Sequence, residues 1–391
     1  MNKSFYNLIF LFIFKHKSKH LSIFFISIVL IFILSSVMFI SSSIKHQVKL
    51  SIKNQSELIV HRISGGKISD IPLSWIDDFS SIYGIQSVQS RVYGKYWFEP
   101  YKTYFNIVGV DIFEEHTNKA FKNILGDIDL REFVSEDYIL VGSAVKKIMN
   151  EKRYENSFDF RLDNNDLITA KIYKELPVNT TLFTNDMIIM DISLAKEILN
   201  INEDFTTSFA ISIPNELEIP NIKNQLIFKH PDIKVTSKDE LLKDYENLFN
   251  YKGGIFLVLY IVSLLTFVLV LYERFTMVNS SDKKEIGILK SIGFSIKDIL
   301  KLKIYENLFI GLSAFIIGII FAYVFVFIFN APILSEIFMG YKNIDSTFEF
   351  IPFIETSLII SLFFFYILPF IGSILIPVWK IAVIDAVESM R

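Results

Sequence analysis

A glycine-lysine run is the first group of residues in this sequence whose types and spacing could bind a phosphate. Gly65-Gly66-Lys67 has the form of the end of a phosphate-binding loop. Such a loop needs a glycine five residues before its second glycine and a serine or threonine after the lysine. His61 and Ile68 stand at those two positions. The sequence therefore predicts no nucleotide site in this chain, and any ATP that drives the protein must be bound, with its Mg²⁺, by another subunit.

Acid–base and metal-binding patterns give no candidate centre either. The acidic pairs Asp77-Asp78 and Glu114-Glu115 are neighbours in the chain, so their side chains diverge and are predicted to be solvated. The absence of cysteine excludes disulfides, thiolate metal sites and thiol catalysis. No catalytic residue, cofactor-binding residue or metal ligand is predicted, and the protein is not expected to be an enzyme. The six histidines are scattered and are interpreted as surface or packing residues: His16, His20, His46, His61, His116 and His230.

The segment with a specific pattern is Lys283–Lys303, KKEIGILKSIGFSIKDILKLK. It is basic and amphipathic, which is typical of a helix lying on an anionic membrane surface. A surface helix has no need of Gly287 and Gly293, because each glycine weakens a helix by about 1 kcal/mol relative to alanine. The two glycines indicate close approach to another backbone, or a bend.

Composition places this segment in a membrane protein, because 51% of the residues are hydrophobic and the mean hydropathy is +0.41. A helix that spans a bilayer needs about 20 mostly apolar residues. Ion-coupled carriers place ionisable groups in mid-membrane, and no Asp, Lys, Arg or His is found there in these segments, so energy must enter from elsewhere. Four segments qualify as spans: Leu21–Ile40, Ile255–Tyr272, Leu308–Phe329 and Ile351–Ile376.

The distribution of lysine and arginine among the connecting segments predicts the orientation. The N-terminal segment and the second-to-third loop are basic, the tail carries Lys380 and Arg391, and the third-to-fourth loop has only Lys342. Both termini are therefore predicted to be cytoplasmic, with Ser41–Lys252 outside. The first apolar segment is longer than the usual signal-peptide core of about 7–15 residues, so we expect an uncleaved anchor. The net charge of −3 gives no sign of nucleic-acid binding.

The outer segment mixes strand-like alternation with helical spacing. The predicted fold class is therefore an integral membrane protein of four transmembrane helices, with a large α+β extracytoplasmic domain between the first and second. Within that domain we expect a hairpin turning at Asn164-Asn165, a helix capped by Asp191 and a helix over Pro220–Lys229. Two βαβ-like halves are compatible with this order of elements.

Helices are predicted to continue from the membrane into this domain at both of its ends. Apolar residues recur every four positions after the first span, and Ser237 with Glu240 forms a capping-box pattern before the second. Two adjacent glycines would form a joint between stalk and span, the alternative being an ordinary loop before a membrane helix. The predicted stalk and joint residues are Ile44, Val48, Ile52, Gly253 and Gly254.

These assignments divide the chain into nine parts. An N-terminal segment at the membrane surface is followed by the first span, the outer domain and the second span. A coupling loop then leads to the third span, a short outer loop, the fourth span and the tail. In the same order, the boundaries are 1–20, 21–43, 44–252, 253–274, 275–305, 306–329, 330–350, 351–376 and 377–391.

The loop motif resembles that of a known family. Glu285–Gly293 (EIGILKSIG), followed by Asp298-Ile299, is similar to the motif after the second span in the FtsX/MacB/LolC superfamily of ABC permeases, the type VII or mechanotransmission transporters. Pro377–Arg391 resembles the Pro-led ending of that family, with Ala386 in place of the usual proline. The outer segment, with VGSAVKKI at Val141, resembles the periplasmic core domain of LolC and MacB.

The resemblance implies a mechanism and a set of partners. Two permeases, identical or paralogous, assemble with two copies of a separate ABC ATPase in the inner membrane, among membrane lipids. Closing of the ATPases moves stalk helices and outer domains, so that work is done on a lipoprotein, a peptide or an envelope component, together with a periplasmic or outer-membrane partner. Ile286, Leu289 and Ile292 are expected to form an apolar ridge for the ATPase. The implied ATPase-coupling residues are Glu285, Ile286, Gly287, Leu289, Lys290, Ile292 and Gly293.

The layout discriminates among branches of the superfamily. A MacB-like chain would carry an N-terminal ATPase, an FtsX-like divisome protein has a smaller outer domain, and a Bce-type permease has many more spans. The LolC/LolE layout, and with it lipoprotein export, fits best. The alternative from another class is a non-transport receptor or a scaffold that regulates an envelope enzyme, which would give no reason for the EIGILKSIG loop.

Overall fold

The computed structural model describes residues 3–53, 55–115, 130–162, 164–176, 184–276, 287–339 and 350–383. The chain divides into two compact units, and each is described by itself. The first unit comprises Met1–Ser43, Phe249–Phe338 and Pro352–Arg391 and is helical. The second comprises Ile44–Leu248 and Met339–Ile351 and contains the β-sheets. In sequence, the second unit therefore interrupts the first twice, and its main segment begins and ends inside two long helices.

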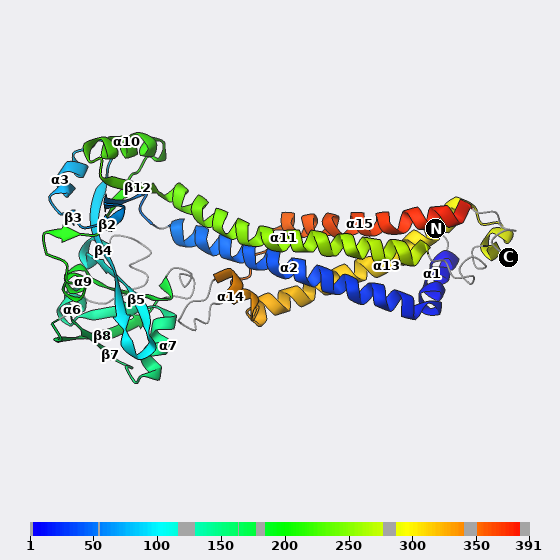
Figure 1. Cartoon of the computed structure of the whole chain (residues 1–391), viewed down its shortest axis with the longest axis horizontal. Helices are drawn as coiled ribbons and strands as arrows, with labels where there is room; N and C mark the ends of the chain where they lie inside the picture. Colours follow the sequence, from blue (N-terminus) through cyan, green and yellow to red (C-terminus); the bar gives the residue numbers. More distant parts are fainter. Residues whose placement is uncertain are drawn as a thin grey trace. The chain divides into compact units, whose positions relative to one another are not determined.

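Long apolar helices account for the first unit (Figure 1). Four helices in the described part of the chain are long and apolar enough to cross a membrane, over His20–Ile52, Lys238–Glu273, Ile296–Ile328 and Thr356–Ile376. The prediction of four such helices, with an α+β domain between the first and second, is confirmed. The helices are α1 (Lys3–Lys15), α2 (Lys17–Lys53), α11 (Lys238–Thr276), α13 (Ile296–Tyr323, continued as a π-helical turn over Val324–Ile328), α14 (Leu334–Met339) and α15 (Thr356–Val383).

All four long helices begin at other residues than the predicted spans, and local signals explain the starts of α11 and α15. The helix α11 begins at Lys238, because Ser237 and Glu240 form the predicted capping box: the Glu240 N–H donates to Ser237 Oγ at 3.2 Å, and the Ser237 N–H donates to Glu240 Oε2 at 3.0 Å. The helix α15 begins at Thr356 rather than at Ile351. Pro352 disfavours helical backbone at the residue before it.

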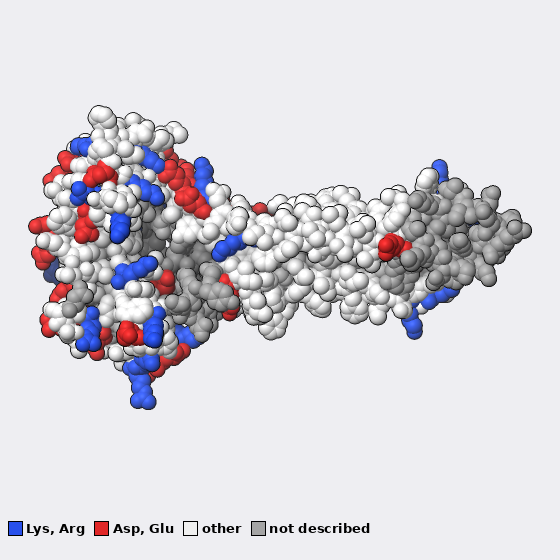
Figure 2. All heavy atoms as spheres, viewed as in Figure 1, with Lys and Arg blue, Asp and Glu red and all other residues white. Residues whose placement is uncertain are grey.

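Apolar side chains from four helices form the core of the first unit. Ile31 of α2, Phe267 of α11, Phe315 of α13 and Phe370 of α15 are all buried in one cluster. The helices α2 and α13 approach closely at Gly318, where an added Cβ would lie 2.9 Å from the Ile31 side chain. Small residues permit such close packing of apolar helices. On the face drawn in Figure 2, few charged side chains lie along this bundle, as expected for a lipid-facing surface.

A ten-stranded sheet runs through the described part of the second unit, in the order β12-β1-β11-β4-β5-β9-β6-β8-β7, with β2 paired to β1. The pairs β5–β9 and β6–β8 are parallel and the others antiparallel. Because β11 and β12 both pair antiparallel with β1, β11, α10 and β12 form a split βαβ unit. The strands of this sheet are β1 (Leu58–Ser64), β2 (Lys67–Ser69), β4 (Ser87–Phe98), β5 (Thr103–Val110), β6 (Tyr138–Val141), β7 (Ser157–Arg161), β8 (Leu167–Glu175), β9 (Met187–Asp191), β11 (Ser208–Ser212) and β12 (Ile233–Ser237).

Short elements surround this sheet. A two-stranded sheet pairs β3 (Ile71–Pro72) with β10 (Phe205–Thr206). The helices of the unit are α3 (Trp75–Ser80), α4 (Ile112–Glu115), α6 (Leu130–Ser135), α7 (Ser143–Glu151), α9 (Ile192–Leu199) and α10 (Ile219–Lys229), with 3₁₀ turns at Glu99–Tyr101 and Glu216–Glu218.

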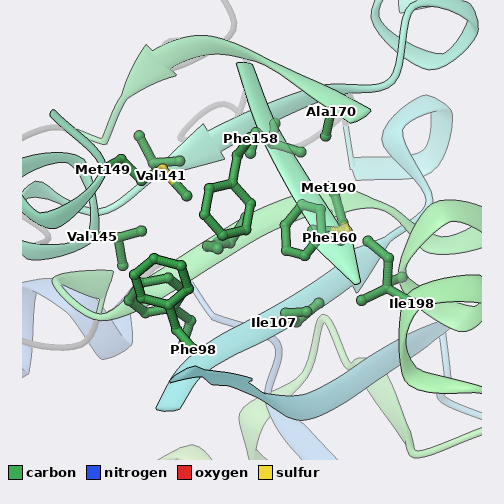
Figure 3. Packing of buried hydrophobic residues seen from close by; sticks show 14 of the residues in the cluster. Phe98, Ile107, Val141, Val145, Met149, Phe158, Phe160, Ala170, Met190 and Ile198 are labelled. Carbon is green, nitrogen blue, oxygen red and sulfur yellow. The ribbon is translucent and has the colours of Figure 1, made fainter. Parts of the chain in front are cut away.

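Three apolar clusters stabilise the described part of this unit, the smallest of them around Val108, Phe133 and Leu140. One lies between α3, α10 and the β12–β1–β11 end of the sheet, where the rings of Phe79 and Phe209 meet edge to face at 5.6 Å. A second packs α7 and α9 against the remaining strands, and Figure 3 shows Phe158 and Phe160 at its centre, with ring centroids 4.8 Å apart. These clusters lie along one continuous sheet.

Local sequence signals in this unit give the expected elements. The strands β7 and β8 form the predicted hairpin, with Asn165 in left-handed conformation (φ 70°). Asp191 caps α9, because its carboxylate accepts from the Ser193 N–H at 2.9 Å. The predicted helix over Pro220–Lys229 is α10.

The contrast between a buried and an exposed phenylalanine provides a test of the second core. Phe158→Ala should lower the local free energy of unfolding by about 3–5 kcal/mol, because it leaves a cavity among packed rings. Phe228→Ala is the matched control, since Phe228 is 90% exposed and a surface change costs about 0.5 kcal/mol or less. Hydrogen exchange of the β7 and β8 amides in the full-length protein would measure both. Equal protection in the two variants would contradict this core.

Candidate coupling site

The described part of the predicted coupling site is a single helical turn that ends at a glycine. Residues 287–291 are helical, and Glu285 and Ile286 lie outside the described residues. The Phe294 N–H donates to the Leu289 carbonyl at 3.0 Å and the Gly293 N–H donates to the Lys290 carbonyl at 3.0 Å. With Gly293 at φ 98°, this is a Schellman motif. The sequence left two explanations for the glycines, a close approach to another backbone and a bend. At Gly293 the structure shows a bend, because nothing lies within 4 Å of an added Cβ.

A second signal fixes where the next helix begins. Ser295 and Asp298 form a capping box at the start of α13: the Asp298 N–H donates to Ser295 Oγ, and the Ser295 N–H donates to the Asp298 carboxylate, both at 3.2 Å. Sequence reasoning took Asp298 only as part of the family motif. The Schellman motif and the capping box together hold residues 287–294 at a set angle to α13.

The turn presents a different apolar face from the one predicted. Leu289 is buried in a cluster with Ile9 and Phe12 of α1 and with Ile299 and Leu302 of α13. Ile288 and Ile292, four residues apart on the helical turn, are 54% and 70% exposed. The prediction that Leu289 belongs to an exposed ridge with Ile286 and Ile292 is therefore wrong, because Leu289 is buried. The sequence does not reveal that α1 covers one side of this turn.

The N-terminal helix α1 is the element that takes up the buried side. The rings of Phe10 and Phe309 meet edge to face with centroids 5.5 Å apart, and Lys303 Nζ lies 5.1 Å from the centroid of the Phe12 ring. The segment expected at the membrane surface thus packs on α13. Gly287 is buried as well, whereas Lys290 is half-buried.

Next to this cluster lies a buried polar group that the sequence analysis missed. His20 of α2 and Glu306 of α13 are 6% and 1% exposed, and His20 Nε2 lies 2.8 Å from Glu306 Oε1. Lys303 Nζ lies 3.0 Å from Glu306 Oε2. His16 lies one turn before His20 with its ring 6.5 Å away. The sequence held two signals for this group. The histidines are four residues apart, and Glu306 is a single acid just before the third apolar segment.

The predicted stalk residues lie in continuous helices. Ile44, Val48 and Ile52 are buried in α2, which extends to Lys53. Gly253 and Gly254 lie inside α11, which passes through both without interruption. An added Cβ at Gly254 would meet nothing within 4 Å. The joint at these glycines stays a prediction, because a continuous helix neither requires nor opposes bending there.

The remaining sequence candidates have local roles. Gly65 and Gly66, at φ 57° and 78°, form the tight turn between β1 and β2, where Ser64 pairs with Lys67. Asp77 and Asp78 lie in the first turn of α3. Within the described residues, no group of three or more His, Cys, Asp or Glu side chains could hold a metal ion.

One comparison, with known protein families, covers the loop motif. Residues 257–386 match the FtsX-like permease C-terminal family. Comparison with curated proteins gave no significant match. Among solved structures, the periplasmic region of MacB from Actinobacillus actinomycetemcomitans is 12% identical, with 51% of this chain and 98% of that one covered and a TM-score of 0.33. The extracellular domain of the noncanonical ABC-type transporter YknZ from Gram-positive bacteria is 9% identical, with 46% and 100% covered and a TM-score of 0.30.

The bend at Gly293 can be tested by substitution. Gly293→Val places a β-branched residue at positive φ, which costs roughly 1–2 kcal/mol, and should speed amide exchange over residues 288–294 about tenfold in the full-length protein. Gly254→Ala is the control, because alanine in an open helical position strengthens the helix and should leave this exchange unchanged. Slow exchange in Gly293→Val would show that the turn does not depend on glycine.

Proposed function

We propose, from the premise that residues 257–386 are an FtsX-like permease domain, that this chain couples a separate ABC ATPase to mechanical work outside the membrane. FtsX-like permeases are membrane subunits of ABC transporters. The observation that carries the proposal is the turn at residues 287–293, which is fixed on one side by Leu289 and presents Ile288 and Ile292 on the other. An exposed apolar pair on a rigid helical turn is suited to a groove on a partner protein.

Connectivity supports the proposed transmission to the outer domain. The helix α2 ends at Lys53, five positions before β1 begins at Leu58, and β12 ends at Ser237 directly before α11. β1 and β12 pair antiparallel with Leu58 opposite Ser237, and the Lys238 N–H donates to the Glu57 carbonyl at 3.0 Å. Displacement of either helix would therefore act on one hydrogen-bonded strand pair.

The same proposal includes the orientation and the partners. Both termini and the coupling turn are cytoplasmic, and the sheet unit is extracytoplasmic, in the inner membrane of a LolC/LolE-like machine. Two permease copies, or this chain and a paralogue, act with two ATPases on a lipoprotein, a peptide or an envelope component. Bound ATP and Mg²⁺ belong to the ATPase. The alternative, a receptor or scaffold, would not need an ATPase.

Cysteine labelling tests the orientation, and the absence of native cysteine gives a clean background. Cysteines at Ser56 and at Glu203, which is exposed, should react in intact cells with a membrane-impermeant maleimide. A cysteine at Ile292 should react only after the membrane is permeabilised. Labelling at Ile292 in intact cells would overturn the proposed topology.

Substitution of the exposed turn tests ATPase docking. Ile292→Asp should leave the chain folded, since the side chain is exposed, but would bury a charge in the docked complex at a cost of about 3 kcal/mol, a hundredfold loss of affinity. Recovery of the co-purifying ABC ATPase measures this. Ile68→Asp is the matched control, because Ile68 is 66% exposed on β2, away from the turn in sequence.

Two comparisons separate docking from its alternatives. A turn that only rests on lipid predicts that Lys290→Ala, together with changes at Lys283 and Lys284, weakens the protein more than Ile292→Asp does. Leu289→Asp should instead release α1 from α13, because Leu289 is part of the cluster with Phe12. If no ABC ATPase is recovered with the unmodified chain, the proposed function is wrong.

A further inference from the structure

A buried carboxylate joins α2 to α13 beside the coupling turn. Glu306 is 1% exposed and has a cationic or polar neighbour at each oxygen: His20 Nε2 of α2 at 2.8 Å and Lys303 Nζ of its own helix at 3.0 Å. Removing one partner from a buried charge is costly, because the remaining charge is left without compensation. The contact between His20 and Glu306 therefore resists separation of the two helices.

The same two helices pack together along much of their length, with their chains running in the same direction. Beyond His20 and Glu306, Ile31 packs on Gly318, and the rings of Phe32 and Phe325 have centroids 5.2 Å apart. These apolar contacts hold the two helices through shape alone. The contact between His20 and Glu306 adds specific partner atoms that would be separated if either helix shifted, so it favours one register between α2 and α13.

The turn at residues 287–293 is linked to the contact between His20 and Glu306 through intervening side chains. Leu289 packs in one cluster with Leu302 and Phe12, and Lys303 contacts both the Phe12 ring and Glu306. A push on the turn would reach α13 and α1 through the cluster. It would reach α2 through His20 and, by connectivity, β1 through the end of α2 at Lys53.

We propose that His20, Glu306 and Lys303 form a clamp that makes α2 move with α13, so that displacement of the coupling turn reaches β1. The clamp rests on the proposed function, because the ATPase supplies the displacement. His20 and Glu306 act here as positioning residues and contact neither nucleotide nor substrate.

The test uses the full-length protein with its co-purified ABC ATPase, with and without ATP and vanadate. Hydrogen exchange of β1 and β12 reports whether nucleotide acts on the strand pair, and ATPase recovery reports docking. Glu306→Gln should leave recovery within twofold of the unmodified chain and reduce the nucleotide-dependent change in exchange at least tenfold. Asn307→Ala is the matched control, because Asn307 is equally buried but its amide donates to the Lys303 carbonyl of its own helix.

A conservative variant separates the clamp from general misfolding. His20→Gln keeps an N–H donor near the position of Nε2 and should retain at least half of the nucleotide response, whereas His20→Leu, which has no donor, should abolish it. A full response in Glu306→Gln, or an equal loss in Asn307→Ala, would overturn the clamp.

Absence of ATPase from the unmodified chain would instead contradict the proposed function. The clamp can then still be tested in the chain alone, by cross-linking cysteines introduced at Phe32 and Phe325. The cross-linking rate should fall in Glu306→Gln and be retained in His20→Gln, and an unchanged rate in Glu306→Gln would overturn the clamp.

Discussion

The antiparallel pairing of β1 with β12 is the interaction on which the arrangement of this chain depends. β1 follows α2, and β12 leads into α11, so the two longest helices are attached to neighbouring strands. The pairing covers five residue pairs, from Leu58 with Ser237 to Arg62 with Ile233, and the ion pair of Arg62 with Asp232 lies at its end. Without it, α2 and α11 would be attached to strands that are not hydrogen-bonded to each other.

The bundle helices satisfy a different constraint, which is the cost of charge in an apolar environment. The core that joins α2, α11, α13 and α15 is made of aliphatic and aromatic side chains. Its polar members in the described residues include Tyr260 and Tyr366, whose rings pack while their hydroxyls are buried. Among the described residues of this cluster, the ionisable side chains are tyrosines.

Much of the fold could be predicted because it depends on local signals. Twenty-residue apolar runs give the spans, Asn164-Asn165 gives the hairpin, and Ser237 with Glu240 gives the start of α11. The strand order could not be predicted in the same way, since β1 pairs with β11 and β12, far along the chain. Neither the alternation within a strand nor its flanking turns specify such distant partners.

The coupling site shows the same division between local and tertiary information. The motif from Gly287 to Gly293 was visible in the sequence, and its glycines indicated either a close approach to another backbone or a bend. Which face is exposed was not, because Leu289 and Ile292 are equally apolar and only α1 distinguishes them. His20 and Glu306 are 286 positions apart by their numbers, and neither is unusual alone. Their contact becomes visible only in the structure, where α2 and α13 bring a buried imidazole and a buried carboxylate to 2.8 Å from each other. Such a pair is costly to bury, and the rest of the described bundle core has none. Apolar residues of similar size would pack there at least as well. A need for a fixed register between α2 and α13 therefore explains the pair better than stability does.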